Sequence, residues 1–227
     1  MQRPKHASVS KPVKKQANQP TKSHGGPGEV RIISGQWKGR KLPVLNVEGL
    51  RPTTDRVKET LFNWLMQDVH GRRVLDCFSG SGSLAFEALS RHASYALLLE
   101  LDAGAAKQLQ QNLARLGQAP AEVKQSNCLS FLSSAAASPF DLVFLDPPFR
   151  QGLLEPACQL LETKGWLADD ALIYVEAEKE LALTQLPATW RLLKEKIAGQ
   201  LAYRLFVRDS EQELGKDLEP ELQPSRS

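Results

Sequence analysis

Cysteine is scarce in this chain of 227 residues. The three cysteines, Cys77, Cys128 and Cys158, form no Cys-x-x-Cys pair, which argues against a zinc site and against a disulfide framework. The four histidines are spread along the sequence, so we expect no metal. No apolar run approaches the roughly 20 residues that span a bilayer, and no apolar segment follows the charged N-terminus as in a secretory signal. We therefore expect a soluble, cytoplasmic protein with no membrane contact.

Positive charge is concentrated near the N-terminus. Residues 1–58 hold 13 of the 29 lysines and arginines but only three acidic residues, and the remainder of the chain has an acidic excess. Such asymmetry suggests a polyanionic partner such as a nucleic acid. A solubilising tail is the alternative, but the charge continues past the tail into a patterned segment. The residues expected to contact phosphates there are Arg31, Lys38, Arg40 and Lys41.

Composition and hydrophobic periodicity divide the chain into four segments. The first is rich in Lys, Pro, Ser and Gln with almost no aliphatic residues, which predicts disorder. In the second, strands at 30–34 and 41–45 are predicted to form a β-hairpin, and apolar residues at helical spacing from Val57 predict a helix that ends near Gly71. The predicted segments are a disordered basic tail over 1–28, a basic extension over 29–70, a catalytic domain over 71–209 and an acidic tail over 210–227.

Short apolar strands alternate with helices in the third segment. The predicted strands are 74–77, 95–101, 122–125, 142–145 and 171–176, and the predicted helices are 84–91, 103–116 and 153–163. Two alternating runs, 190–197 and 201–208, predict a terminal antiparallel hairpin. The alternation predicts an α/β fold with a parallel sheet covered on both faces. Ligands of such sheets bind beyond the carboxyl ends of the strands.

A glycine-rich loop follows the first of these strands. Gly80 and Gly82 permit a tight turn and a close approach to a ligand, while the missing Gly-Lys-Ser/Thr sequence argues against a nucleoside triphosphate. Asp76 before the loop would repel a pyrophosphate but suits a ligand with an ammonium and a sulfonium. Glu100 closes the next strand, about 20 residues later, where a carboxylate can accept both ribose hydroxyls. Asn127 follows the third strand and is either an adenine contact or a helix cap.

The most specific motif is Asp146-Pro147-Pro148-Phe149, which directly follows a buried strand. It suits an amine on an aromatic base, whose lone pair is delocalised into the ring and is poorly nucleophilic. Asp146 and the carbonyl of Pro147 can accept the two amine hydrogens, and a fixed carboxylate stabilises the positive charge that develops on nitrogen. The prolines stiffen the loop, and Phe149 offers a stacking face worth about 1–3 kcal/mol. The alternative is a proline-rich turn with a hydrophobic plug.

Together these residues resemble class I S-adenosylmethionine-dependent methyltransferases that act on exocyclic amines. Segments 30–43, 50–63, 165–167 and 198–204 are more narrowly similar to the RsmD family, and the resemblance covers about residues 29–208. It implies a Rossmann-like fold with a seven-stranded, mostly parallel sheet, an antiparallel terminal hairpin and an N-terminal RNA-binding extension. It also implies methylation of guanine N2 in 16S ribosomal RNA, within a partly assembled small subunit. Nothing in the sequence demands more than a monomer, which is the state we expect.

The resemblance assigns roles to individual residues. It implies cofactor contacts by Asp76, Phe78, Ser79, Gly80, Gly82, Glu100, Asn127 and Cys128, and a catalytic loop of Asp146, Pro147, Pro148 and Phe149. Arg51, Thr53 and Arg56 are candidate substrate contacts that would lie over the cofactor or the flipped base. The alternative for this segment is helix capping by Thr53 or Thr54 with exposed arginines. Two other functions remain open. An adenine-N6 methyltransferase on DNA usually needs a target-recognition insert, for which the gaps between strands leave no room. A non-enzymatic RNA-binding or assembly factor would not need the intact acidic residues.

Overall fold

A computed structural model describes residues 28–45, 54–117, 119–181 and 185–209. Both predicted tails, apart from Gly28, and the candidate residues Arg51 and Thr53 lie outside the described residues. No helix within the described ranges is long and apolar enough to cross a membrane.

The N-terminal extension consists of a small antiparallel sheet and a helix. Its elements are β1 (Gly28–Arg31), β2 (Lys41–Val44) and α1 (Asp55–Trp64). β1 ends earlier than predicted because the backbone N–H groups of Ile33 and Ser34 donate to the Glu87 carboxylate, at 2.8 and 3.0 Å, and not to a strand partner. The helix also ends earlier than predicted, at Trp64, and turns connect it to the next strand.

Seven strands form the main sheet. They are β3 (Arg73–Asp76), β4 (Tyr95–Glu100), β5 (Ala121–Gln125), β6 (Phe140–Leu145), β7 (Leu167–Glu178), β8 (Trp190–Ala198) and β9 (Leu201–Arg208). Their order is β5-β4-β3-β6-β7-β9-β8, in which the first five are parallel and β9 is antiparallel to both of its neighbours. The predicted mostly parallel sheet with an antiparallel terminal hairpin is confirmed.

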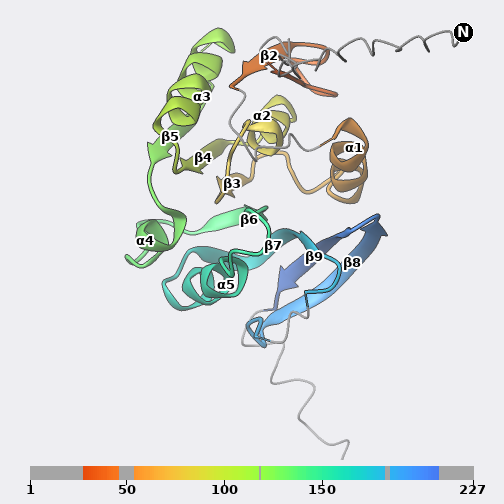
Figure 1. Cartoon of the computed structure of the whole chain (residues 1–227), viewed down its shortest axis with the longest axis vertical. Coiled ribbons are helices and arrows are strands. Elements are labelled where there is room, and N and C mark those ends of the chain that lie inside the picture. The colour runs from red at the N-terminus through yellow and green to blue at the C-terminus, as the bar shows by residue number, and fades with distance from the viewer. Residues whose placement is uncertain (1–27, 46–53, 118, 182–184, 210–227) are drawn as a thin grey trace, which may run out of the picture.

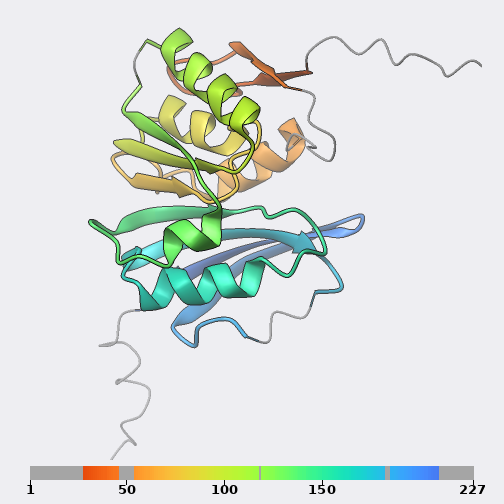
Figure 2. The same cartoon turned by 60° about the vertical axis from the view of Figure 1, so that its left-hand side comes forward.

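Helices cover both faces of this sheet (Figures 1 and 2). The remaining helices are α2 (Ser83–Ser90), α3 (Ala103–Arg115), α4 (Cys128–Leu132) and α5 (Leu154–Thr163). One hydrophobic cluster joins the N-terminal hairpin, α1, α2 and α3 to the first face, and a second cluster joins α4 and α5 to the opposite face. The short helix α4 was not predicted.

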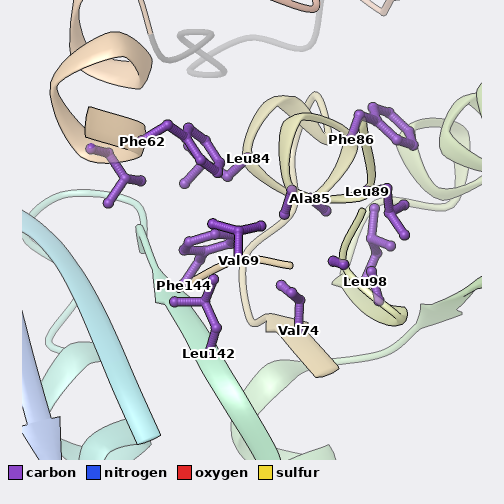
Figure 3. Packing of buried hydrophobic residues seen from close by; sticks show 14 of the residues in the cluster. Phe62, Val69, Val74, Leu84, Ala85, Phe86, Leu89, Leu98, Leu142 and Phe144 are labelled. Atoms are coloured by element: carbon purple, nitrogen blue, oxygen red, sulfur yellow. The ribbon is translucent and has the colours of Figure 1, made fainter. Parts of the chain in front are cut away.

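Side-chain alternation along the strands determines which residues reach the first face. Phe144 of β6 and Tyr174 of β7 project there with their rings 6.3 Å apart, and Phe62 of α1 packs edge-on against Phe144 at 6.2 Å. Figure 3 shows Phe62, Phe144 and Leu98 within this cluster. Because side chains in a strand alternate, the residues two positions beyond Leu98, Phe144 and Tyr174 also lie on the first face, at the carboxyl ends of the strands.

The N-terminal hairpin is attached to α2 by buried polar contacts. Besides the two N–H groups of the hairpin, the fully buried Glu87 carboxylate accepts from Arg91 at 2.8 Å. Ser90 adds two contacts, since its carbonyl accepts from the Gln36 N–H at 2.8 Å and its hydroxyl donates to the Ser34 carbonyl at 2.6 Å. These polar contacts fix the hairpin to α2, and its apolar side chains belong to the same hydrophobic cluster as the first face of the sheet.

Candidate active site

The glycine-rich loop leads from β3 into α2. Gly82 immediately precedes the helix with φ of +73°, and a Cβ there would lie 2.4 Å from Phe86 and 2.6 Å from Leu109. Both the left-handed backbone and the space therefore require glycine. Gly80 also has a positive φ, of +49°. The loop brings backbone N–H groups and the N-terminus of α2 next to the ends of β3 and β4.

Asp76, the last residue of β3, is buried beneath this loop with 3% of its surface exposed. Its carboxylate accepts backbone hydrogen bonds from Phe78 and Ala85. Ser79 ties the loop to the strands, because its hydroxyl donates to the Asp76 carbonyl at 3.1 Å and its N–H donates to the Leu99 carbonyl at 2.9 Å. Burial, assisted by the charge of Glu100, raises the pKa of Asp76 from 3.8 to about 7 despite these hydrogen bonds.

Glu100 ends β4 beside the same loop. One carboxylate oxygen accepts the N–H of Gly80 at 2.8 Å, and the other accepts the N–H of Asp102 at 2.8 Å. The side chain is only partly buried, and each oxygen retains a further lone pair. Glu100 is thus held in a fixed orientation with acceptor capacity left for a ligand such as a ribose.

Four carboxylates lie at the carboxyl ends of adjacent strands on the first face, and we call this group the acidic row. In the order β4, β3, β6 and β7, its members are Glu100, Asp76, Asp146 and Glu176. The strand register places Asp76 level with Leu98 and Phe144, which is two residues before Glu100 and Asp146, and it pairs Leu145 with Val175. Asp146 and Glu176 are therefore next to each other at the following position.

Electrostatic interactions connect the members of the acidic row. Burial has the largest effect on Asp146, and the negative charges of Glu176 and Asp76 add to it. All three effects raise the pKa of Asp146, which lies well above its ordinary value. Burial raises the pKa of Glu176 to about 7, although a hydrogen bond from the Tyr174 hydroxyl opposes the shift. A nearby cation would stabilise the ionised forms of these carboxyl groups. The acidic row thus fits a positively charged ligand.

The predicted catalytic tetrapeptide begins at the centre of the acidic row. Pro147 is buried, whereas Pro148 is exposed and Phe149 has 44% of its surface exposed. Arg150 then adopts a left-handed conformation with φ of +59°, and its N–H donates to the Glu178 carboxylate at 2.5 Å. The loop is thus connected to β7 at its far end, and the Phe149 ring is free to contact a ligand.

The remaining predicted cofactor residues lie in different surroundings. Asn127 is exposed and caps α4, because its side-chain oxygen accepts the N–H of Ser130 at 3.1 Å. The capping alternative is therefore confirmed, and the Asn127 amide NH2 remains as the group that could contact an adenine. Cys128 is buried in the second cluster and Phe78 packs against it. A cofactor contact by Cys128 would have to use its backbone.

The basic residues of the hairpin lie away from the acidic row. Lys38 and Arg40 are exposed in the turn that contacts Ser90, at the end of α2 opposite the glycine-rich loop, and α2 is about 12 Å long. Arg40 also donates to the Arg115 carbonyl at the end of α3. Lys41 pairs with Glu29 at 3.0 Å. Arg31 on β1 and Arg56 in the first turn of α1 are exposed as well.

Sequence reasoning did not identify Glu176 as a site residue. The signal was present, because Glu176 closes the apolar run 171–175 as Glu100 closes the run 95–99. Tyr174 and Tyr203 accompany it: Tyr174 donates to Glu176 at 3.2 Å, and Tyr203 is its register partner on β9. Among the residues that the structure describes, no group of three or more His, Cys, Asp or Glu is arranged to hold a metal ion.

Comparison with known proteins finds close relatives of the sequence. The family described as "Conserved hypothetical protein 95" matches residues 30–207. Ribosomal RNA small subunit methyltransferase D from Escherichia coli is 55% identical over 195 residues, which cover 86% of this chain and 98% of the relative. The protein of the same name from Haemophilus influenzae is 57% identical over 182 residues, which cover 79% of this chain and 94% of the relative.

Solved structures share the fold. A methyltransferase from Escherichia coli has a TM-score of 0.76 at 54% identity and covers 80% of this chain and 99% of its own. A methylase from Haemophilus influenzae has a TM-score of 0.72 at 52% identity and covers 81% of this chain and 100% of its own. These similarities confirm the predicted Rossmann-like methyltransferase fold.

Proposed function

Because the chain belongs to the ribosomal RNA small subunit methyltransferase D family, the RsmD family predicted from the sequence, we propose that it methylates N2 of a guanine in 16S ribosomal RNA with S-adenosylmethionine as methyl donor. The names of the relatives support an enzyme that modifies small-subunit ribosomal RNA. The observation that carries the proposal is the position of Asp146, which begins the Asp-Pro-Pro-Phe segment and interacts electrostatically with Asp76, the carboxylate beneath the glycine-rich loop.

The cofactor fits the first half of the acidic row. When bound, S-adenosylmethionine supplies a methyl group on a positively charged sulfur. Asp76 and Glu100 would hold the ammonium and ribose ends, the Gly80–Gly82 backbone leaves room for close approach, and Asn127 is the candidate for the adenine. The raised pKa values of Asp76 and Asp146 support this assignment because a cationic ligand favours their ionised forms.

Asp146 and Pro147 would act on the guanine amine. The Asp146 carboxylate and the Pro147 carbonyl accept the two N2 hydrogens, so that the nitrogen lone pair is directed out of the ring plane. As positive charge develops on N2, the fixed carboxylate stabilises it without reorganisation. The high pKa of Asp146 also makes it an effective acceptor for the departing proton. Pro148 stiffens the loop, and Phe149 stacks on the extruded base.

The substrate and the cellular setting complete the proposal. We expect the target guanine within a partly assembled small subunit, in the cytoplasm, and a monomeric enzyme. Arg31, Lys38, Arg40 and Lys41 would contact phosphates at a distance from the target base, and Arg51, Thr53 and Arg56 would make further contacts with the substrate. In this arrangement the exposed hairpin increases the affinity for RNA, and the residues at the strand ends bind the cofactor and carry out the methyl transfer.

The test combines a single substitution with identification of the product. Wild-type protein, Asp146→Ala and the exposed control Asp169→Ala are incubated with labelled S-adenosylmethionine and small-subunit particles from cells that lack the protein. We expect N2-methylguanosine with wild type and control, and a loss of at least about 10³-fold with Asp146→Ala while cofactor binding is retained. Lost cofactor binding would reassign Asp146 to the cofactor.

Free DNA in the same assay separates the other functions. Methyl transfer to adenine N6 of DNA would replace the proposal by the DNA methyltransferase. Binding of particles by the wild type without any transfer would favour an assembly factor that lacks activity.

A further inference from the structure

One buried carboxylate of the acidic row has no part in the reaction as proposed. Glu176 is 6% exposed and lies on β7, on the side of Asp146 that faces away from Asp76 and Glu100. The cofactor occupies the other side of Asp146 in the proposed reaction. The base whose amine meets Asp146 therefore has Glu176 as its neighbour.

The contacts of Glu176 hold the carboxylate in one orientation. The Tyr174 hydroxyl donates to Oε2 at 3.2 Å from two positions earlier on the same strand, and Tyr203 lies opposite on β9. A buried carboxylate is costly unless its acceptor positions are filled. One neutral donor leaves further lone pairs, which suit a ligand with two adjacent N–H groups.

We propose that Glu176 recognises the Watson–Crick edge of the target base by accepting the guanine N1–H together with the nearer N2–H. This inference rests on the proposed function, because it assumes that the N2 amine lies at Asp146. The N2–H on the N1 side is then shared by Glu176 and the Pro147 carbonyl, and the other N2–H points to Asp146, so the two carboxylates hold the amine from both sides. Adenine presents an N1 lone pair in place of the N1–H, which the Glu176 carboxylate repels. Glu176 therefore excludes adenine, while Asp146 serves any exocyclic amine.

The first experiment changes only the substrate. Small-subunit particles are reconstituted with 16S ribosomal RNA that contains either guanine or 2,6-diaminopurine at the target position. Diaminopurine keeps the 2-amino group but replaces the N1–H by a lone pair. We expect wild-type protein to methylate guanine with a kcat/KM about 100-fold higher or more, since the site loses a donor to a charged acceptor. Equal rates on the two bases would overturn the assignment of Glu176, and no transfer to guanine would instead overturn the proposed function.

The second experiment changes the acceptor. Glu176→Gln keeps the size of the side chain but adds an amide NH2 that can donate to N1 of diaminopurine. We expect its preference for guanine to fall below about tenfold, with a gain on diaminopurine and unchanged cofactor binding. Glu122→Gln, on the exposed edge strand β5, should keep the wild-type preference. A Glu176→Gln protein that loses activity on both bases in the same proportion would reduce Glu176 to a structural residue.

Tyr174→Phe tests how Glu176 is positioned. Without the hydroxyl, the carboxylate is less well held, so we expect KM for the guanine particles to rise severalfold while the methylated product stays the same. An unchanged KM and an unchanged base preference would remove Tyr174 from the recognition of the base. This variant retains the aromatic contact with Phe144, so a change in KM would not come from a lost core side chain.

Discussion

Replacing Asp76 by asparagine should remove a loss of stability that the wild-type protein undergoes as the pH rises, and it should weaken binding of the cofactor. Asp76 has a pKa of about 7 in the folded protein against 3.8 for an exposed carboxyl. Between these values the folded state retains a proton that the unfolded chain has lost. The free energy of unfolding therefore falls as pH rises from about 4 to about 7, and it is constant above that range with respect to this group.

The magnitude follows from the width of that interval. One pH unit corresponds to about 1.4 kcal/mol, so wild-type protein should lose about 2 kcal/mol through Asp76 between pH of about 5.5 and about 8. Asp76→Asn has no such loss. Urea denaturation of both proteins at the two pH values, without cofactor, measures the difference. Asp169→Asn, at an exposed position, serves as the matched control.

The test depends on how the difference in free energy of unfolding between Asp76→Asn and wild type changes with pH, and not on its size at one pH. Asparagine also alters the hydrogen bonds from Phe78 and Ala85, and that effect is the same at both pH values. A gap that does not widen by at least about 1 kcal/mol toward alkaline pH would refute the reasoning, because Asp76 would then not retain a proton on folding.

Cofactor binding should show the opposite trend in wild-type protein. Because a cation binds to the ionised form of Asp76, affinity should rise up to about tenfold per pH unit below pH of about 7. The cofactor's own amine, with a pKa of about 8, limits the rise at higher pH. Calorimetric titration of Asp76→Asn should give weaker binding with a smaller dependence on pH below 7 than in wild type, the remainder coming from Asp146.

Other predictions concern the loop and the hairpin. Gly82→Ala should lower the free energy of unfolding by about 2 kcal/mol or more in urea denaturation, because a Cβ would overlap Phe86 and Leu109 as well as strain the backbone. Gly117→Ala, with a positive φ but open space, should cost only about 1 kcal/mol; equal losses would contradict the steric argument. Glu87→Gln should cost about 2–3 kcal/mol and speed amide exchange in the hairpin, and unaltered exchange would show that the contact does not hold it. Neutralising Lys38 and Arg40 should lower RNA affinity and reduce the slope of log affinity against log salt by about 2; an unchanged slope would exclude them from the interface.

The alternation of strands and helices was predictable because the central strands of the sheet are buried on both faces. Apolar runs such as 95–99 and 142–145 give an unambiguous signal of that kind. β7 was harder, since it begins at Leu167 and passes through Asp169 and Asp170, which suggest a turn. Asp170 does have a positive φ of +55°, and the pairing of β6 with β7 shifts nearby, so the strand continues through an irregularity.

Site residues were predictable from the sequence where the segment around each residue is distinctive by itself. Asp76 and Glu100 end apolar strands and Asp146 directly follows one, and the topology brings these strand ends together. Glu176 differs, because its importance depends on lying beside Asp146 across two strands, and only the register of β6 with β7 reveals that. Helix α4 was missed for another reason: five residues are too few to give a helical period.

The attachment of the hairpin to Glu87 has a consequence for synthesis of the chain. The two N–H groups that this carboxylate binds come from residues 53 and 54 positions earlier. At about 5–20 residues per second, the hairpin waits several seconds for its anchor to be made. During that time its apolar side chains have no α2 to cover them, so the hairpin remains an exposed apolar segment of the nascent chain until Ser90 has been added.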